Sequence, residues 1–215
     1  AKDVGLLSLK FGKYNPDISL FVTDDQQAEY FKVVISAAGE IHPEWKEKTI
    51  HRTHGRMSFK GAKMSSRLGN VPLATDILDT VHDEALARMQ EKNDILADQI
   101  SLSALKFTIL KTAAGKNINF DPETSLSFEG DSGPYLQYTF ARCKSLLEKA
   151  KSEGFEMSEE PKDDWLPGEL EKTLYRFSEV IEESIANWAP HYIATYLLEF
   201  ARTFNSWYGN TKVLD

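Results

Sequence analysis

The sequence contains a single cysteine, Cys143, among its 215 residues. One thiol cannot form an internal disulfide or build a cysteine-based zinc site, which suits a reducing compartment. Long apolar runs are also missing: none approaches the ~18 residues of a membrane-spanning helix, and we expect no signal peptide. Because 41% of the residues are hydrophobic, we predict a soluble, cytoplasmic, globular protein.

Basic residues are in the minority, since 25 Lys and Arg face 33 Asp and Glu. This balance argues against a simple basic nucleic-acid binder. The charge is nevertheless uneven: residues 42–70 carry seven basic and two acidic side chains, and residues 151–183 carry four basic and eleven acidic ones. We expect anionic ligands to bind the first third of the chain, although two solvated faces explain the charge alone equally well.

Short elements of different types follow one another at the start of the chain. Residues 5–14 predict a helix, the apolar run 18–22 predicts a buried parallel strand, and 26–38 predict a helix that ends at Gly39. This succession is typical of an α/β sheet. Because so small a sheet cannot cover both of its faces, we interpret the stretch as part of a larger α/β domain.

The rest of the chain has mainly helical spacing. Thr75 is a candidate N-cap, and Pro134 stands at a helix-entry position. Apolar residues recur every three or four positions in the ranges 75–89, 95–113, 134–151, 164–186 and 190–208. The polar stretch 152–163 is the predicted linker. Helix packing should therefore dominate the second half.

Residues 61–70 combine two cations, two hydroxyls and flanking glycines. Glycine lets a backbone approach a ligand closely, and Lys63 and Arg67 can neutralise phosphate oxygens. The order of a Walker loop is missing. A phosphate-contacting loop and a plain basic surface turn both fit this pattern. The two histidines His51 and His54 lack a third ligand, so we predict no metal site.

Several ordered motifs indicate a family. Residues 63–67, Lys-Met-Ser-Ser-Arg, resemble the second signature of class I aminoacyl-tRNA synthetases. Residues 130–138, Gly-Asp-Ser-Gly-Pro-Tyr-Leu-Gln-Tyr, resemble a specific run of the arginyl-tRNA synthetases. Further segments fit the same family: residues 2–6, 26–27, 127–129 and 204–208. The family's first signature, His-x-Gly-His, is not among these motifs.

The resemblance implies an α/β fold followed by an all-α part. Residues 1–85 would be the C-terminal part of a class I Rossmann catalytic domain, and 86–130 a helical connection. Residues 131–215 would form an incomplete helical anticodon-binding domain. The implied activity is that of an arginine–tRNA ligase, which activates L-arginine with ATP and transfers it to tRNA(Arg). We expect this fragment alone to be inactive.

The resemblance also assigns roles in substrate binding. Asp3 would pair with the arginine guanidinium, and Gln27 would contact the same substrate. Gly55 and Met57 would bind the adenine of ATP through main-chain atoms. Tyr30 stands where the family commonly has histidine, and it receives no role. ATP, accompanied by Mg²⁺, is a substrate, and no metal site of the protein itself is implied.

Catalysis is assigned to the signature loop. Cations beside the reacting phosphate favour the transition state, so Lys63 and Arg67 are candidate catalytic residues. Ser65 and Ser66 are candidate catalytic hydrogen-bond donors. Lys63 and Met64 would also bind ATP. The loop departs from the family: Ser66 stands where the standard signature has lysine, and Leu68 where a common variant has lysine. A non-catalytic paralogue is therefore an alternative.

Recognition of tRNA is assigned to the helical half, because aromatic side chains stack on unpaired bases. Tyr208 and Tyr138 are the candidates for stacking, and Arg142 for a phosphate contact. Other aromatics fall at core spacing: Tyr135, Trp188, Phe204 and Trp207. A tRNA-binding module without catalysis is a further alternative. We expect no DNA or membrane partner, and a monomer when the protein is full length.

Overall fold

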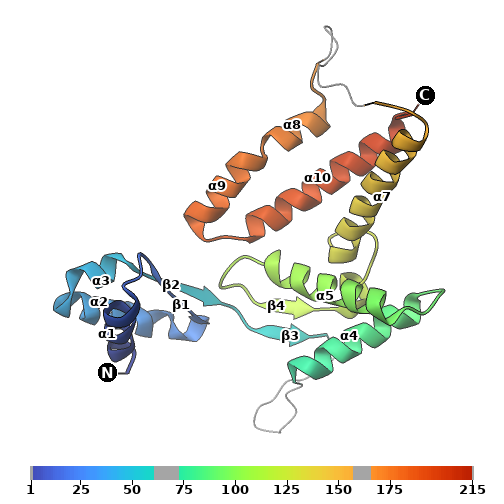
Figure 1. Cartoon of the computed structure of the whole chain (residues 1–215). Coiled ribbons are helices and arrows are strands. Elements are labelled where there is room, and N and C mark those ends of the chain that lie inside the picture. The colour runs from blue at the N-terminus through green and yellow to red at the C-terminus, as the bar shows by residue number, and fades with distance from the viewer. Residues whose placement is uncertain (1, 61–72, 157–165, 215) are drawn as a thin grey trace. The chain divides into compact units, whose positions relative to one another are not determined.

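The computed structural model describes residues 2–60, 73–156 and 166–214 (Figure 1). It contains two compact units, which are described separately. The first consists of residues 1–57 and 114–118, and the second of residues 58–113 and 119–215. No helix in the described ranges is both long and apolar enough to cross a membrane.

A two-stranded parallel sheet lies in the first unit. Strand β1 (Ser19–Asp24) pairs with β2 (Thr49–His54) in the register that places Asp24 opposite His54. The helical elements of this unit are α1 (Lys2–Tyr14), the 3₁₀ turn η1 (Asp25–Gln27), α2 (Ala28–Ile41) and α3 (Pro43–Glu47). Their shared core comprises Leu7, Phe11, Phe21, Phe31, Val34, Ala38 and Trp45. The predicted order of helix, strand and helix is confirmed.

Helix α2 does not end where the sequence predicted. Gly39 lies inside the helix, which continues to Ile41. A Cβ atom at Gly39 would lie 2.9 Å from Cβ of Lys46 on α3, closer than real Cβ atoms approach other atoms. The glycine therefore allows α2 and α3 to approach closely, and it is not a stop signal.

Helices dominate the second unit, as predicted. Its strands are short: β3 (Met57–Phe59) and β4 (Ile118–Phe120) pair with each other and contain the boundaries between the units. The helices are α4 (Ala74–Arg88), α5 (Asp94–Leu110), α6 (Pro122–Ser125), α7 (Gly133–Ser152), α8 (Glu169–Tyr175), α9 (Phe177–Asn187) and α10 (His191–Asn210). The predicted fold class, α/β followed by all-α, is confirmed.

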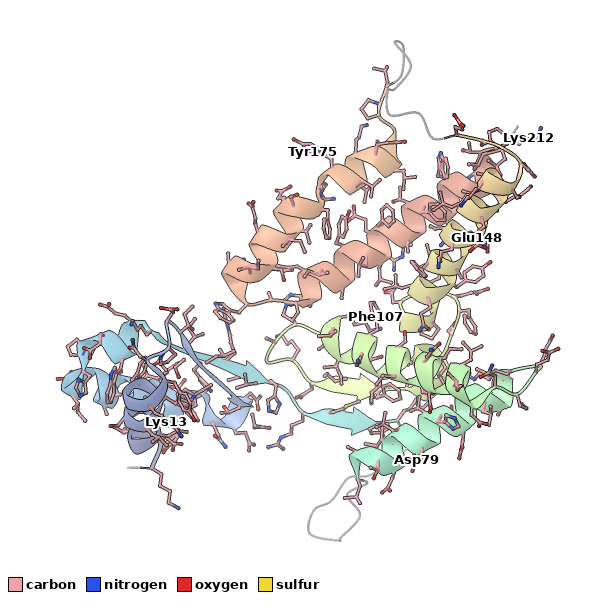
Figure 2. All side chains as sticks on the ribbon, in the orientation of Figure 1. Lys13, Asp79, Phe107, Glu148, Tyr175 and Lys212 are labelled. Atoms are coloured by element: carbon pink, nitrogen blue, oxygen red, sulfur yellow. The ribbon has the colours of Figure 1, made fainter. Side chains whose placement is uncertain are left out.

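Helix α10 organises the helical bundle. It packs against α7, α8 and α9 (Figure 1). Phe107 of α5 forms a buried cluster with Ala194 and Leu198 of α10 (Figure 2). At the other extreme, Tyr175 at the end of α8 is 90% exposed and points away from α10 (Figure 2). Helix α10 is thus buried on more than one side, because the hydroxyl of its buried Tyr196 donates to the Thr173 carbonyl of α8.

Helix ends in this unit confirm some predictions and correct others. Pro134 lies in the first turn of α7, as predicted, after the N-cap Ser132. Thr75 is not a cap: Leu73 precedes α4, and its amide donates to Asp76 Oδ2 at 3.0 Å. The predicted helix 164–186 is two helices that meet at Arg176. Trp188 is not in the core, because it ends α9 in a left-handed conformation and is 37% exposed.

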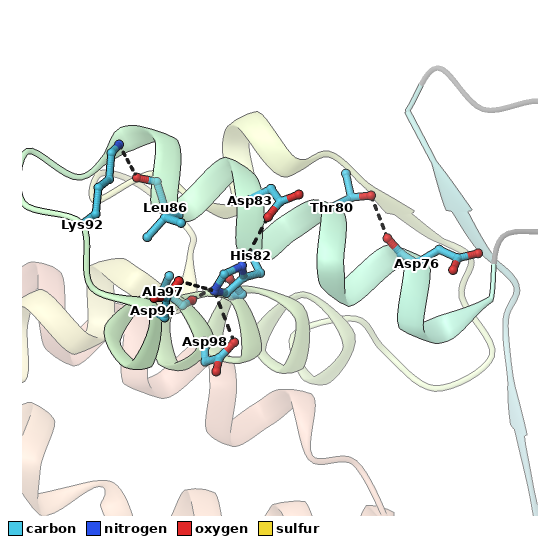
Figure 3. Close-up of polar contacts among 10 residues, drawn as sticks. Asp76, Thr80, His82, Asp83, Leu86, Lys92, Asp94, Ala97 and Asp98 are labelled. Carbon is cyan, nitrogen blue, oxygen red and sulfur yellow. Dashed lines mark hydrogen bonds and ion pairs between the residues drawn. The ribbon is translucent and has the colours of Figure 1, made fainter.

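Helices α4 and α5 meet through a histidine among carboxylates (Figure 3). His82 of α4 points at the start of α5, where its Nε2 lies 3.6 Å from Asp98 Oδ1 and 3.9 Å from Asp94 Oδ1. Its Nδ1 lies 3.4 Å from Asp83 Oδ1 on its own helix. His82 thus lies among three carboxylates, two of them on α5, where the two helices are in contact.

Candidate functional site

Two candidate substrate-binding residues of the first unit, Gln27 and Gly55, lie just after the carboxyl ends of its two parallel strands. Because Asp24 and His54 end their strands opposite each other, Gln27 and Gly55 follow those strands at the same edge, where parallel sheets bind ligands. Arg56 joins the two strand ends, with its Nε 3.4 Å from Asp24 Oδ2. Gln27 is exposed on the turn that leads from β1 into α2.

Asp24 shapes the turn that carries Gln27. Its Oδ1 accepts a hydrogen bond from the amide of Gln26 at 3.0 Å. This backbone hydrogen bond, followed by side-chain contacts that include Arg56, holds the pKa of Asp24 below its usual value. Asp24 is therefore ionised at neutral pH and fixes the start of η1 as its N-cap. The prediction that Gln27 contacts arginine is neither tested nor contradicted by this placement.

Asp3, in the first turn of α1, contacts the first turn of α2. It shares one face of α1 with the buried residues Leu7 and Phe11, at successive spacings of four. Its Oδ2 accepts a hydrogen bond of 2.6 Å from the hydroxyl of Tyr30 in the first turn of α2. Asp3 therefore contacts a residue that lies three positions after Gln27, although Asp3 and Gln27 are distant in sequence.

The ring of Tyr30 is anchored to the core of the unit. It packs edge-on against Phe31, with ring centroids 5.4 Å apart. Phe31 is buried, and its ring stacks on that of His51, with centroids 4.6 Å apart. His51 Nε2 also lies 2.8 Å from Thr23 Oγ1, and burial lowers the pKa of His51. His51 is therefore a neutral packing residue that supports the Tyr30 side of the site.

The predicted adenine segment is held tightly by main-chain contacts. Gly55 is buried, and a Cβ atom there would lie 2.6 Å from the amide nitrogen of Asn117 and closer still to the carbonyl of Lys116. The amide of Arg56 donates to Asn117 Oδ1 at 2.9 Å, and its carbonyl accepts from Ile118 at 2.8 Å. Met57 follows as the first residue of β3 and is half-buried. The ATP-binding roles of Gly55 and Met57 stay predictions.

The predicted catalytic loop lies outside the described residues. This applies to Lys63, Met64, Ser65, Ser66, Arg67 and Leu68, and to most of the predicted linker 152–163. The catalytic and ATP-binding roles predicted for this loop therefore stay predictions.

The three candidate tRNA-binding residues form one cluster in the second unit. The guanidinium carbon of Arg142 lies 4.6 Å from the ring centroid of Tyr138 and 5.1 Å from that of Tyr208. The guanidinium also donates to the Tyr138 hydroxyl. The Tyr208 ring stacks on the buried ring of Phe204, with centroids 5.9 Å apart. Two tyrosines and a cation from α7 and α10 thus form a joint surface.

Asn205 locks Arg142 into that cluster. Its side-chain oxygen accepts a hydrogen bond of 2.6 Å from Arg142 Nη1. Its amide nitrogen donates to Thr139 Oγ1 at 2.8 Å and to the Tyr135 hydroxyl at 3.1 Å. The guanidinium is therefore held by protein groups, whereas the sequence predicted that it contacts phosphate. That phosphate contact stays a prediction.

Sequence reasoning assigned no role to two residues of these sites. Asn205 belongs to the motif 204–208 that the sequence singled out. Nothing in that motif predicted its hydrogen bonds to Tyr135, Thr139 and Arg142 on α7. Tyr30 shares one face of α2 with the buried Val34 and Ala38, at the same spacing of four as Asp3 on α1. Because both residues precede buried residues at the same spacing, the sequence could have indicated that Asp3 and Tyr30 lie on the two helix faces that pack together.

Comparisons with known proteins agree on one family. The family model of the DALR anticodon binding domain matches residues 136–215. The arginine–tRNA ligase of Leuconostoc citreum is 37% identical over 210 residues, which cover 94% of this chain and 37% of the ligase. That of Limosilactobacillus reuteri is 34% identical over 220 residues, with 100% of this chain and 39% of the ligase covered.

A solved structure agrees as well. The arginyl-tRNA synthetase of Thermus thermophilus superposes with a TM-score of 0.75 at 29% sequence identity, covering 92% of this chain and 34% of that one. This chain is homologous to part of the arginyl-tRNA synthetases. As such a homologue, it spans less than two fifths of the length of its curated relatives. The cluster of Tyr138, Arg142 and Tyr208 lies within the matched anticodon-binding domain.

Proposed function

We propose that this chain is the part of an arginine–tRNA ligase that holds the arginine side chain, the signature loop and the anticodon. The main support is similarity to such ligases over 94–100% of the chain. The reaction would be attack of the arginine carboxylate on the α-phosphate of ATP, followed by transfer of arginine to tRNA(Arg). We place this reaction in the cytoplasm.

Asp3 and Gln27 would bind the arginine side chain. Asp3 is half-buried and held by Tyr30 at 2.6 Å, so its carboxylate can meet a planar guanidinium with little reorganisation. A charge-assisted pair with two parallel hydrogen bonds favours this side chain over lysine, which offers a single ammonium group. Gln27 follows β1 on the neighbouring turn, where its amide can add a hydrogen bond.

The ATP side would use main-chain atoms and the signature loop. Gly55 and Met57 would contact the adenine through main-chain atoms, as the family resemblance implies. Lys63 and Arg67, with Ser65 and Ser66, would neutralise charge that develops on the phosphoryl oxygens and the departing pyrophosphate. Mg²⁺ would arrive with ATP, and we assign it no ligand from this chain.

The anticodon would bind the cluster of Tyr138, Arg142 and Tyr208. Stacking of an unpaired base on an aromatic ring contributes about 1–3 kcal/mol. Because Arg142 is fixed between the two tyrosines, the rings are held in place before RNA binds. The acidic stretch 151–183 would repel RNA and should lie away from the bound strand.

ATP–pyrophosphate exchange tests the ligase function in the complete protein that carries this chain. We expect exchange that depends on L-arginine, measured with tRNA present. Asp3→Asn should raise the KM for arginine strongly and leave the dissociation constant of the tRNA unchanged. Absence of exchange with arginine would rule out the ligase. An unchanged KM in Asp3→Asn would mean that the arginine site is elsewhere.

The 215-residue chain alone fits a second function, that of a tRNA-binding module without catalysis. The observation that favours it is the complete Tyr138–Arg142–Tyr208 cluster. Electrophoretic mobility shifts with an anticodon stem-loop test it directly: Tyr208→Ala should weaken binding about tenfold or more. If the complete protein binds this RNA but lacks exchange, the module or a non-catalytic paralogue is the correct description.

A further inference from the structure

Tyr30 contacts the carboxylate that we assign to substrate recognition, although the family resemblance gave it no role. Its hydroxyl donates to Asp3 Oδ2 at 2.6 Å. Within the part of the chain that the structure describes, Asp3 Oδ1 has no hydrogen-bond partner. One oxygen of the carboxylate is therefore held, and the other is available to a ligand.

The geometry of the pair is set by the packing of two helices. On α1, Asp3 is followed at spacings of four by the buried Leu7 and Phe11. On α2, Tyr30 is followed at the same spacing by Val34 and Ala38. The four apolar residues belong to one core. The backbones of both polar residues are thus fixed by the core, and the hydrogen bond removes the remaining freedom of the carboxylate to rotate.

A tyrosine hydroxyl leaves the carboxylate able to bind a guanidinium. A carboxylate offers about four acceptor positions on its two oxygens, and a bidentate guanidinium occupies one on each. Tyr30 occupies one position on Oδ2, so three remain. Because the hydroxyl also partly satisfies the charge before a ligand arrives, the free site keeps Asp3 in place without an ion pair.

We propose that Tyr30 is a positioning residue that orients the Asp3 carboxylate toward the guanidinium of the amino-acid substrate. This inference rests on the proposed ligase function. Tyr30 acts through Asp3, so removal of its hydroxyl changes the binding of arginine and does not change the binding of ATP. A merely structural contact between α1 and α2 would instead lower the stability of the unit and impair both substrates.

The first test compares Tyr30→Phe with Tyr14→Phe in the complete protein. Each variant loses one hydroxyl from the first unit, but Tyr14 lies at the opposite end of α1. In arginine-dependent ATP–pyrophosphate exchange, Tyr30→Phe should raise the KM for arginine about three- to tenfold, as for loss of a charge-assisted hydrogen bond. Its KM for ATP and its kcat should stay within about twofold of the parent, because loss of a binding contact alone raises KM and leaves kcat unchanged. Tyr14→Phe should change none of these values.

A double-mutant cycle shows whether Tyr30 acts through Asp3. In an Asp3→Asn background, Tyr30→Phe should have little further effect on the KM for arginine. A full effect in that background, an unchanged KM in the single variant, or equal losses for arginine and ATP would each overturn the inference. If the parent protein shows no arginine-dependent exchange, the proposed function fails, which is a different result from any of these.

A second measurement needs no activity and uses the 215-residue chain. The hydrogen bond to Asp3 raises the pKa of the Tyr30 hydroxyl. NMR of ¹³Cζ-labelled tyrosine should therefore show that the pKa of Tyr30 lies above the usual tyrosine value, and Asp3→Asn should lower it. Titration of Tyr30 that is the same in the parent chain and in Asp3→Asn would overturn the pairing itself.

Discussion

Gly55→Ala should destabilise the first unit, because the space for a side chain is already filled by backbone. An added Cβ atom would lie 2.6 Å from the amide nitrogen of Asn117 and nearer still to the Lys116 carbonyl. Neither group can rotate away as a flexible side chain could. Overpacking of this kind costs about 1–3 kcal/mol of unfolding free energy, and we expect the upper part of that range.

Gly12→Ala is the matched control in the same unit. Gly12 lies in α1, and an added Cβ atom there would meet nothing within 4 Å. Because alanine loses less backbone entropy than glycine on forming a helix, this change should stabilise the unit by about 0.5–1 kcal/mol. The same chemical substitution is therefore expected to act in opposite directions at the two positions.

Urea unfolding followed at Trp45 measures both variants. Trp45 is the one tryptophan among residues 1–57 and 114–118, and its ring stacks on Phe11. Labelling with 5-fluorotryptophan and ¹⁹F NMR separates its signal from those of the other tryptophans. A Gly55→Ala variant as stable as the parent would refute the close approach of residues 116–117. Destabilisation by Gly12→Ala would refute the exposed position of that residue on α1.

Three further predictions concern the second unit. The ion pair with Lys60 lowers the pKa of Asp121. The ion pair therefore stabilises the unit above the usual carboxyl pKa, and this stabilisation is lost as the pH falls through the lowered pKa of Asp121. In urea unfolding at several pH values, Asp121→Asn should make the unfolding free energy depend less on pH in the acid range. Gly154 has φ +81° after α7, so Gly154→Ala should lower the unfolding free energy by about 1 kcal/mol, and an unchanged value would exclude that conformation. In the complete protein, Tyr208→Ala should raise the KM for tRNA and leave that for arginine unchanged, whereas equal effects on both would place Tyr208 in the core.

Periodicity in the sequence was sufficient for the long helices and for β1, but it did not predict the short elements β2, β3, β4, α3 and α6. Spacings of three and four indicated every long helix, and the run 18–22 indicated β1, because apolar faces are a property of local sequence. Ends were harder to predict. Gly39 resembled a stop signal, but its role depends on Lys46 of the next helix. Likewise, Leu73 precedes α4 because Asp76 reaches back to its amide, which no propensity of Leu73 could indicate.

The candidate sites were predictable where a motif carried them. Asp3, Gln27 and the tyrosines of the anticodon-binding half were named from resemblance, and the structure brings Tyr138, Arg142 and Tyr208 together. What the sequence could not indicate were contacts between distant residues. Tyr30 reaches Asp3 only because α1 and α2 pack together, and Asn205 reaches Arg142 only because α10 lies beside α7.

The first unit is discontinuous, and this has a consequence for its synthesis. Residues 114–118 belong to it, although residues 58–113 of the other unit come between. A ribosome that has released only residues 1–57 has not yet made Asn117 and Ile118, which hold Arg56. The contacts of Arg56 with residues 117–118 can therefore form only after much of the helical part has been translated.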